Sequence, residues 1–166
     1  MGRTEAILLT WTTYGTWLRG DLRGWVDDGK VLPPDPVLES ADRARMKHSA
    51  FTFHPNNLFD IGQAIGDSLT SRLKLTILAL TVQTWHVHLV VGATSKALPD
   101  IAKCAKDAAR WRLRINRPLW TVKYDKRFCF DPRATHARVE YVEKHNLRLG
   151  WTARPWAFVQ TLVSVV

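Results

Sequence analysis

Two histidines, His86 and His88, stand one residue apart in a short apolar segment, residues 85–92. Successive side chains of a β-strand point to opposite faces, so both imidazoles would face the same way. Neutral imidazole is a common metal ligand, and a pair needs only one or two further donors to complete a site. The spacing therefore indicates a candidate site for one divalent metal ion, with a solvated strand face as the simpler alternative.

A tyrosine and a further histidine lie four residues apart near the C-terminal end of the sequence. Asp131 as N-cap and Pro132 at the first helical position predict a helix that ends near Gly150. Tyr141 and His145 would then be neighbours on one helix face. A tyrosine on an amphipathic helix is ordinary by itself, but together with the histidine pair it becomes a candidate catalytic group.

A sheet must position the histidine pair. Residues 5–13 predict a buried first strand, and residues 74–83 predict a second. Only a short break separates the second strand from the histidine strand, so the two should form an antiparallel hairpin. A helix capped by Asn56 or Asn57 would cover this sheet with an apolar stripe. The stripe consists of Leu58, Ile61, Ile65, Leu69 and Leu73.

Positive charge is concentrated after the histidine strand. Residues 1–95 hold 9 Lys/Arg and 9 Asp/Glu, whereas residues 96–166 hold 15 and 6, so the second part carries the whole net charge of +9. A helix from Pro99 to about Asn116 gathers five cations on one stripe, which favours a track for phosphates over a merely solvated face. The stripe consists of Lys103, Lys106, Arg110, Arg114 and Arg117.

Residues 14–25 predict a loop, because three glycines interrupt a run of aromatic and arginine residues. Its cations, Arg19 and Arg23, are candidate DNA-binding residues, since aromatic rings can stack on bases while neighbouring arginines hold phosphates. A loop that packs only on itself is the alternative.

Length and composition favour one folded domain, residues 1–166, with an apolar C-terminal tail at residues 151–166. No apolar run is long enough for a membrane span, and the N-terminus does not resemble a signal peptide. We therefore expect a cytoplasmic, nucleoid-associated protein that does not bind membranes. Cys104 and Cys129 have no nearby cysteine or histidine partners and are expected to be reduced thiols.

In combination, the histidine strand, the basic helix and the helical tyrosine resemble the single-tyrosine HUH transposases, which include insertion-sequence and REP-associated tyrosine transposases. Residues 9–21 (LTWTTYGTWLRGD) and 23–26 (RGWV) look like the opening of one branch of that family. Leu119 and Trp120, followed by residues 124–130, resemble its stretch before the catalytic helix. The resemblance covers most of residues 7–150.

This resemblance implies an α+β, ferredoxin-like sandwich, with an antiparallel sheet that carries the histidine strand and helices packed on one face. It implies metal-dependent cleavage and strand transfer of single-stranded or hairpin DNA, with a homodimer as a possible assembly. Mg²⁺ or Mn²⁺ would be held by His86, His88 and His145, and Tyr141 would be the nucleophile that forms a 5′-phosphotyrosine link.

Two positions depart from the family pattern. His145 stands where relatives commonly carry Gln or Asn, and Trp85 stands where they often carry a polar residue. A non-catalytic nucleic-acid-binding protein derived from such a transposase therefore remains an alternative. An initiator of rolling-circle replication or plasmid relaxation would share the chemistry, but the short chain argues against it.

Overall fold

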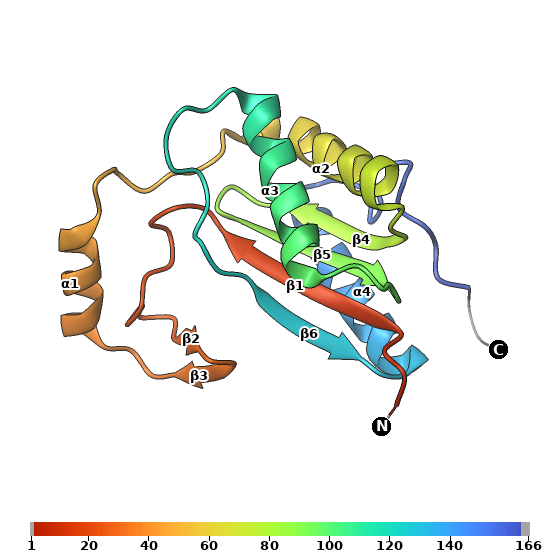
Figure 1. The fold of residues 1–166 in the computed structure, drawn as a ribbon, viewed down its shortest axis with the longest axis horizontal. Coiled ribbons are helices and arrows are strands. Elements are labelled where there is room, and N and C mark those ends of the chain that lie inside the picture. The colour runs from red at the N-terminus through yellow and green to blue at the C-terminus, as the bar shows by residue number, and fades with distance from the viewer. Residues whose placement is uncertain (1, 164–166) are drawn as a thin grey trace.

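A four-stranded antiparallel sheet with the strand order β4-β5-β1-β6 forms the centre of the computed structural model, which describes residues 2–163 (Figure 1). The strands are β1 (Ala6–Thr12), β4 (Ile77–Val82), β5 (His86–Gly92) and β6 (Asp125–Cys129). The predicted hairpin is confirmed, since β4 and β5 pair antiparallel. The histidine strand β5 is therefore an inner strand, with β4 on one side and β1 on the other.

Two helices cover one face of this sheet, α2 (Leu58–Leu73) and α3 (Leu98–Leu113) (Figure 1). The sheet side chains on this face alternate with the histidines, and Leu9 and Leu89 are fully buried there. From α2, Ile65 and its neighbours one turn away enter the same apolar cluster. The stripe predicted from the sequence is thus the core-facing side of α2.

Helix α4 (Pro132–Arg148) lies on the opposite face. Its Val139 and Val142 pack on Leu8 and Val90, which alternate with the residues beneath α2 and α3. The α+β class and the antiparallel sheet are confirmed. Helices were expected on one face only, and this holds for α2 and α3, whereas α4 lies on the other because the strands are apolar on both sides.

A smaller unit lies beside the sheet, formed by a hairpin of β2 (Trp25–Asp27) and β3 (Lys30–Leu32) and by helix α1 (Pro36–Arg45) (Figure 1). Asp35 caps α1 by accepting a hydrogen bond from the backbone N–H of Leu38. A 3₁₀ turn, η1 (Pro55–Asn57), leads into α2. No helix within residues 2–163 is long and apolar enough to cross a membrane.

The C-terminal tail, which is described as far as residue 163, packs on α2 through Trp156 and Phe158. Residues 164–166 lie outside the described range. Trp156 is 1% exposed, and its indole N–H donates to the carbonyl of Phe59 at 3.0 Å. A Cβ at Gly62 would clash with the Trp156 ring, so glycine is required there. Beyond this contact, the N–H of Gln160 donates to the carbonyl of Ile77 in β4. The tail thereby ties α2 to the edge of the sheet.

Candidate metal site and nucleophile

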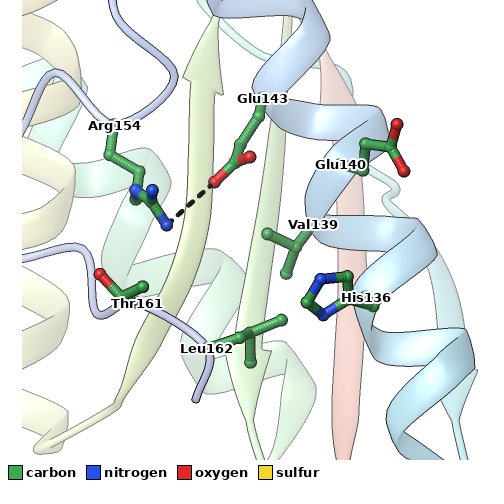
Figure 2. Close-up of a pocket in the computed structure, with 7 residues that line it drawn as sticks. All are labelled: His136, Val139, Glu140, Glu143, Arg154, Thr161 and Leu162. Carbon is green, nitrogen blue, oxygen red and sulfur yellow. Dashed lines mark ion pairs between the residues drawn. The ribbon is translucent and has the colours of Figure 1, made fainter. Parts of the chain in front are cut away.

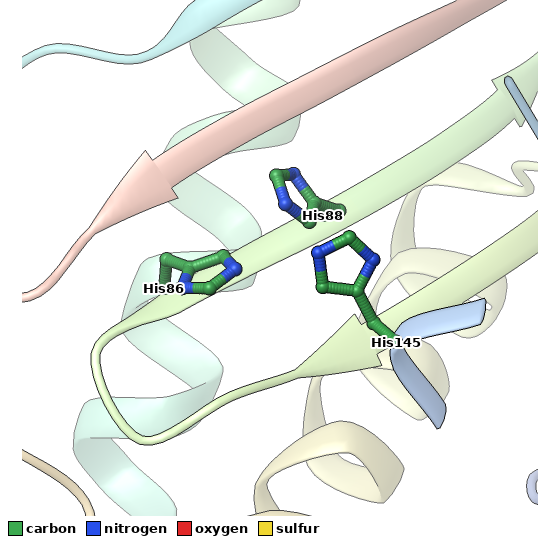
Figure 3. A group of neighbouring side chains, drawn as sticks. All are labelled: His86, His88 and His145. Carbon is green, nitrogen blue, oxygen red and sulfur yellow. The ribbon is translucent and has the colours of Figure 1, made fainter. Parts of the chain in front are cut away.

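Three histidines meet on the face of the sheet that α4 covers (Figure 3). His86 and His88 project from β5, and His145 projects from the last turns of α4. Their ligand nitrogens all lie within 4.8 Å of one another. The structure therefore brings the three predicted ligands together, and this triad could hold a metal ion.

Hydrogen bonds orient two of the imidazoles. The Nδ1 atom of His145 is 2.9 Å from the carbonyl of Tyr141, and because a carbonyl only accepts, Nδ1 carries the proton. In the neutral ring with this hydrogen bond, the lone pair lies on Nε2. Nδ1 of His88 lies 2.7 Å from the hydroxyl of Thr10, its direct partner across β1 and β5. Such outer partners fix the tautomer and the orientation of a ligating imidazole.

Burial keeps the strand histidines neutral. Desolvation, with the neighbouring His86 and His145, lowers the pKa of His88 to about 2. Desolvation, followed by the charges of His145 and Arg23, lowers the pKa of His86 to about 4. Both rings therefore carry a free lone pair at neutral pH, which is the form that binds metals.

One ring nitrogen of His86 supports the fit of a metal ion. Within residues 2–163, its buried Nδ1 has no hydrogen-bond partner. A buried polar atom without a partner costs about 1–3 kcal/mol, and an ion or other partner at this nitrogen would remove the cost. With two neutral strand imidazoles, a third imidazole beside them and this orphaned nitrogen, the donor set fits a divalent metal ion.

Tyr141 lies directly beside the triad. Its ring centroid is 4.9 Å from that of His145 and 5.3 Å from that of His88. The side chain is 43% exposed, so a substrate can reach it. The phenol is thus both next to the candidate metal site and open to solvent, an arrangement suited to a nucleophile.

Asn146 positions this helix, a role not predicted from the sequence. It is 1% exposed, and its side-chain amide donates to the carbonyls of Leu80 in β4 and Ala153 in the tail, at 2.9 and 3.0 Å. These bonds hold the residue next to His145 against the sheet. Its spacing from Val142 places an amide on the buried stripe of α4, and this is the signal that could have identified it.

The predicted basic stripe lies away from the triad. Helix α3 is on the opposite face of the sheet (Figure 1). It also ends at Leu113, earlier than expected, because Arg114 adopts the left-handed conformation with φ 53°. Arg114 and Arg117 are therefore not on the helix. Lys103 remains on it and forms an ion pair with Asp107.

Three stripe residues hold the segment that follows α3. The ammonium of Lys106 donates to the carbonyls of residues 121, 122 and 123, and burial lowers the pKa of Lys106 to about 8. Arg110 donates to the carbonyl of Arg117 at 2.9 Å. The guanidinium of Arg117 lies over the ring of Phe51. These contacts give the cations a structural role, and their contact with DNA stays a prediction.

The two loop arginines differ in place. Arg19 forms a bidentate ion pair with Asp42 of α1. The guanidinium of Arg23 lies 4.7 Å from the ring centroid of Trp85, whose own centroid is 4.1 Å from that of His86. Of these two predicted DNA-binding residues, the structure thus brings Arg23 to the edge of the triad.

A separate pocket of about 300 Å³ lies between α4 and the tail (Figure 2). An ion pair between Arg154 and Glu143, 3.6 Å long, crosses it. The lining residues are His136, Val139, Glu140, Glu143, Arg154, Thr161 and Leu162. The pocket does not include the triad or Tyr141, so this hollow is not where the candidate chemistry lies.

The antiparallel sheet, with α2 and α3 on one face and α4 on the other, forms an α+β fold that is shared with a solved tyrosine transposase. A REP-associated tyrosine transposase bound to a REP hairpin has a similar structure, with a TM-score of 0.53 and 12% identity, over 94% of this chain and 76% of that one. A protein of Deinococcus radiodurans R1, provisionally assigned as a transposase, gives a TM-score of 0.45 and 21% identity, over 87% of this chain and 92% of that one.

At these identities the similarity concerns the fold, and at that level the resemblance seen in the sequence is confirmed. No protein-family model matches the chain. No curated protein sequence matches it either.

Proposed function

We propose that this protein is a transposase-like enzyme that cleaves and rejoins single-stranded DNA through Tyr141. One observation carries the proposal: the exposed phenol ring of Tyr141 lies beside the three-histidine cluster. Its centroid is 4.9 Å from that of His145 and 5.3 Å from that of His88. A tyrosine that served only the packing of α4 would face the sheet core, as Val142 does. The fold shared with a REP-associated tyrosine transposase supports the same conclusion.

In the proposed reaction, the phenolic oxygen of Tyr141 attacks a backbone phosphorus. The new O–P bond forms as the P–O3′ bond breaks, the phenolic proton passes to solvent, and the departing 3′ oxygen takes up a proton. The products are a 5′-phosphotyrosine and a free 3′-OH, and the reverse step joins a strand without ATP. When bound at the three imidazoles, a divalent metal ion supplies a Lewis acid for the phosphate.

The donor set bears on which ion is used. Mg²⁺ prefers an octahedral shell of oxygen ligands, whereas His86, His88 and His145 offer three nitrogens. Of the two ions expected, we therefore propose that Mn²⁺ supports the reaction better than Mg²⁺. The same three residues would hold either ion.

Single-stranded or hairpin DNA is the proposed partner. The excess of positive charge in residues 96–166 supports a polyanionic ligand, and the similar REP-associated transposase is bound to a hairpin. The cations proposed to contact DNA are Lys103, Lys106, Arg110, Arg114, Arg117, Arg19 and Arg23. Tyr141 and the triad lie in one chain, so one copy supplies the whole candidate site, and a homodimer stays a prediction for a mass measurement in solution.

The test is a search for the covalent intermediate. Labelled hairpin DNA that flanks the gene is incubated with the protein and Mn²⁺, Mg²⁺ or EDTA, and the products are separated on a denaturing gel. We expect a slowly migrating protein–DNA species with wild type and metal, and none with Tyr141→Phe or His86→Ala. Tyr124→Phe is the matched control, because Tyr124 packs against the core on the other side of the sheet, and it should form the species normally.

Two results would contradict the proposal: an adduct that survives in Tyr141→Phe, or no adduct under any metal condition. The second, accompanied by salt-sensitive binding of the same DNA, would favour the non-catalytic DNA-binding protein.

A further inference from the structure

Two tryptophans hold the guanidinium of Arg23. Its Cζ atom lies 4.8 Å from the ring centroid of Trp17 and 4.7 Å from that of Trp85. The two indole centroids are 5.4 Å apart. Trp17 is fixed by a 2.7 Å hydrogen bond from its indole N–H to the carbonyl of Gly24. Cation–π contacts with two anchored rings restrict the guanidinium to one position.

Hydrogen bonds occupy only part of the guanidinium. Its Nε and Nη2 atoms donate to the two carboxylate oxygens of Asp21 at 2.8 and 2.7 Å, and Nη2 also donates to the carbonyl of Thr16. Within residues 2–163, Nη1 makes no hydrogen bond, and the side chain is 47% exposed. Asp21 is itself 7% exposed, and the two N–H donors on Nη1 of Arg23 are left for a further acceptor.

The indole ring of Trp85 lies between Arg23 and His86 of the candidate metal site. The centroid of Trp85 lies 4.1 Å from that of His86, the next residue in the chain. The carbonyl of Trp85 accepts hydrogen bonds from the backbone N–H and the hydroxyl of Thr13, which anchor it to the end of β1. The open donors of Arg23 are therefore held at a fixed place one indole away from the first histidine.

We propose that Arg23 binds the phosphate adjacent to the scissile phosphate, with Trp17 and Trp85 as positioning residues. This subsite rests on the proposed DNA-cleaving function. A strand with one phosphate at the triad must place its next phosphate close by, and Arg23 offers charge-assisted donors there. This gives a role to Trp85, which stands where relatives often carry a polar residue. A polar side chain at this position would have no aromatic face to hold the guanidinium.

The test measures binding of a twelve-nucleotide thymidine oligomer without divalent metal, across a series of salt concentrations. For single strands, each phosphate contact contributes about −0.7 to the slope of log Kobs against log salt concentration. Arg23→Gln should reduce the slope by about 0.7 and weaken binding about tenfold or more. Arg43→Gln is the matched control, since Arg43 is also ion-paired and exposed, with Glu39 on α1, and it should leave the slope unchanged.

Two further measurements keep the proposal open to refutation if Arg23→Gln disturbs the loop. In wild-type protein, phenylglyoxal should modify Arg23, and the oligomer should protect it, as read by mass spectrometry, while Arg43 reacts equally with and without DNA. Trp85→Phe should preserve most of the affinity and Trp85→Leu should lose it, because only the first keeps an aromatic face.

An unchanged slope in folded Arg23→Gln, or equal modification of Arg23 with and without DNA, would overturn the subsite, whatever the adduct experiment gives. A reduced slope in Arg23→Gln without any wild-type adduct would support the phosphate subsite and count against the proposed chemistry. The two proposals can therefore fail separately.

Discussion

Thr10→Val removes one hydrogen bond at the triad and almost nothing else, because valine has nearly the shape of threonine. The Thr10 hydroxyl lies 2.7 Å from Nδ1 of His88, a side chain only 7% exposed. Without this partner the buried nitrogen is unpaired, at a cost of about 1–3 kcal/mol. Loss of such an outer partner typically weakens metal binding about 10–100-fold. We expect Thr10→Val to lose Mn²⁺ affinity within this range.

Isothermal titration with Mn²⁺ at neutral pH measures the loss. Thr12→Val is the control, because Thr12 lies on the same face of β1 opposite His86, yet its hydroxyl bonds to Thr121 and not to an imidazole. Equal affinity in wild type and Thr10→Val would refute the idea that this hydroxyl orients a ligand. An equal loss in both variants would show that any change on this strand perturbs the site.

Three further predictions concern stability. In the folded chain the pKa values of His86 and His88 are about 4 and about 2, below the ordinary 6.5, so the unfolded chain binds protons that the folded chain does not. The free energy of unfolding, measured by urea titration, should have its maximum value above pH 6.5 and fall by roughly 2 kcal/mol per histidine by about pH 5. A flat profile would contradict this. Asn146→Ala removes two buried hydrogen bonds to backbone carbonyls and should lower the free energy of unfolding by about 2–4 kcal/mol; a loss below about 1 kcal/mol in chemical denaturation would show that it does not anchor α4. Gly62→Ala should displace the Trp156 ring and cost about 1–3 kcal/mol, with a shift in tryptophan emission; native emission and unchanged stability would disprove the required close contact.

The chemical groups of the site were readable from the sequence because each pair depends on local periodicity. His86 and His88 share a face through the two-residue repeat of a strand. Tyr141 and His145 share one through the helical turn. That the two pairs meet was implied by the resemblance, and the structure places all four side chains together.

Other features required tertiary information. Thr10 becomes a partner of His88 only through the register between β1 and β5, which is set across a long stretch of intervening chain. The helical wheel correctly grouped Lys106 and Arg110, but it could not show that carbonyls of the following segment would surround them. Arg23 stood in a loop with no periodicity, so its place beside Trp85 could not be inferred.

The three candidate ligands come from two elements, a strand and a helix. Binding of an ion is therefore coupled to the packing of that helix on the sheet. His86 and His88 belong to the sheet, whereas His145 reaches them only when α4 is seated through Asn146. An ion shared by both elements would bind the folded chain in preference to the unfolded one, so its binding free energy would add to the free energy of unfolding. Coupling of this kind is reciprocal: a change that weakens the packing of α4 on the sheet lowers the affinity for the ion, and loss of the ion lowers the stability of the packed helix that carries Tyr141 by the same free energy.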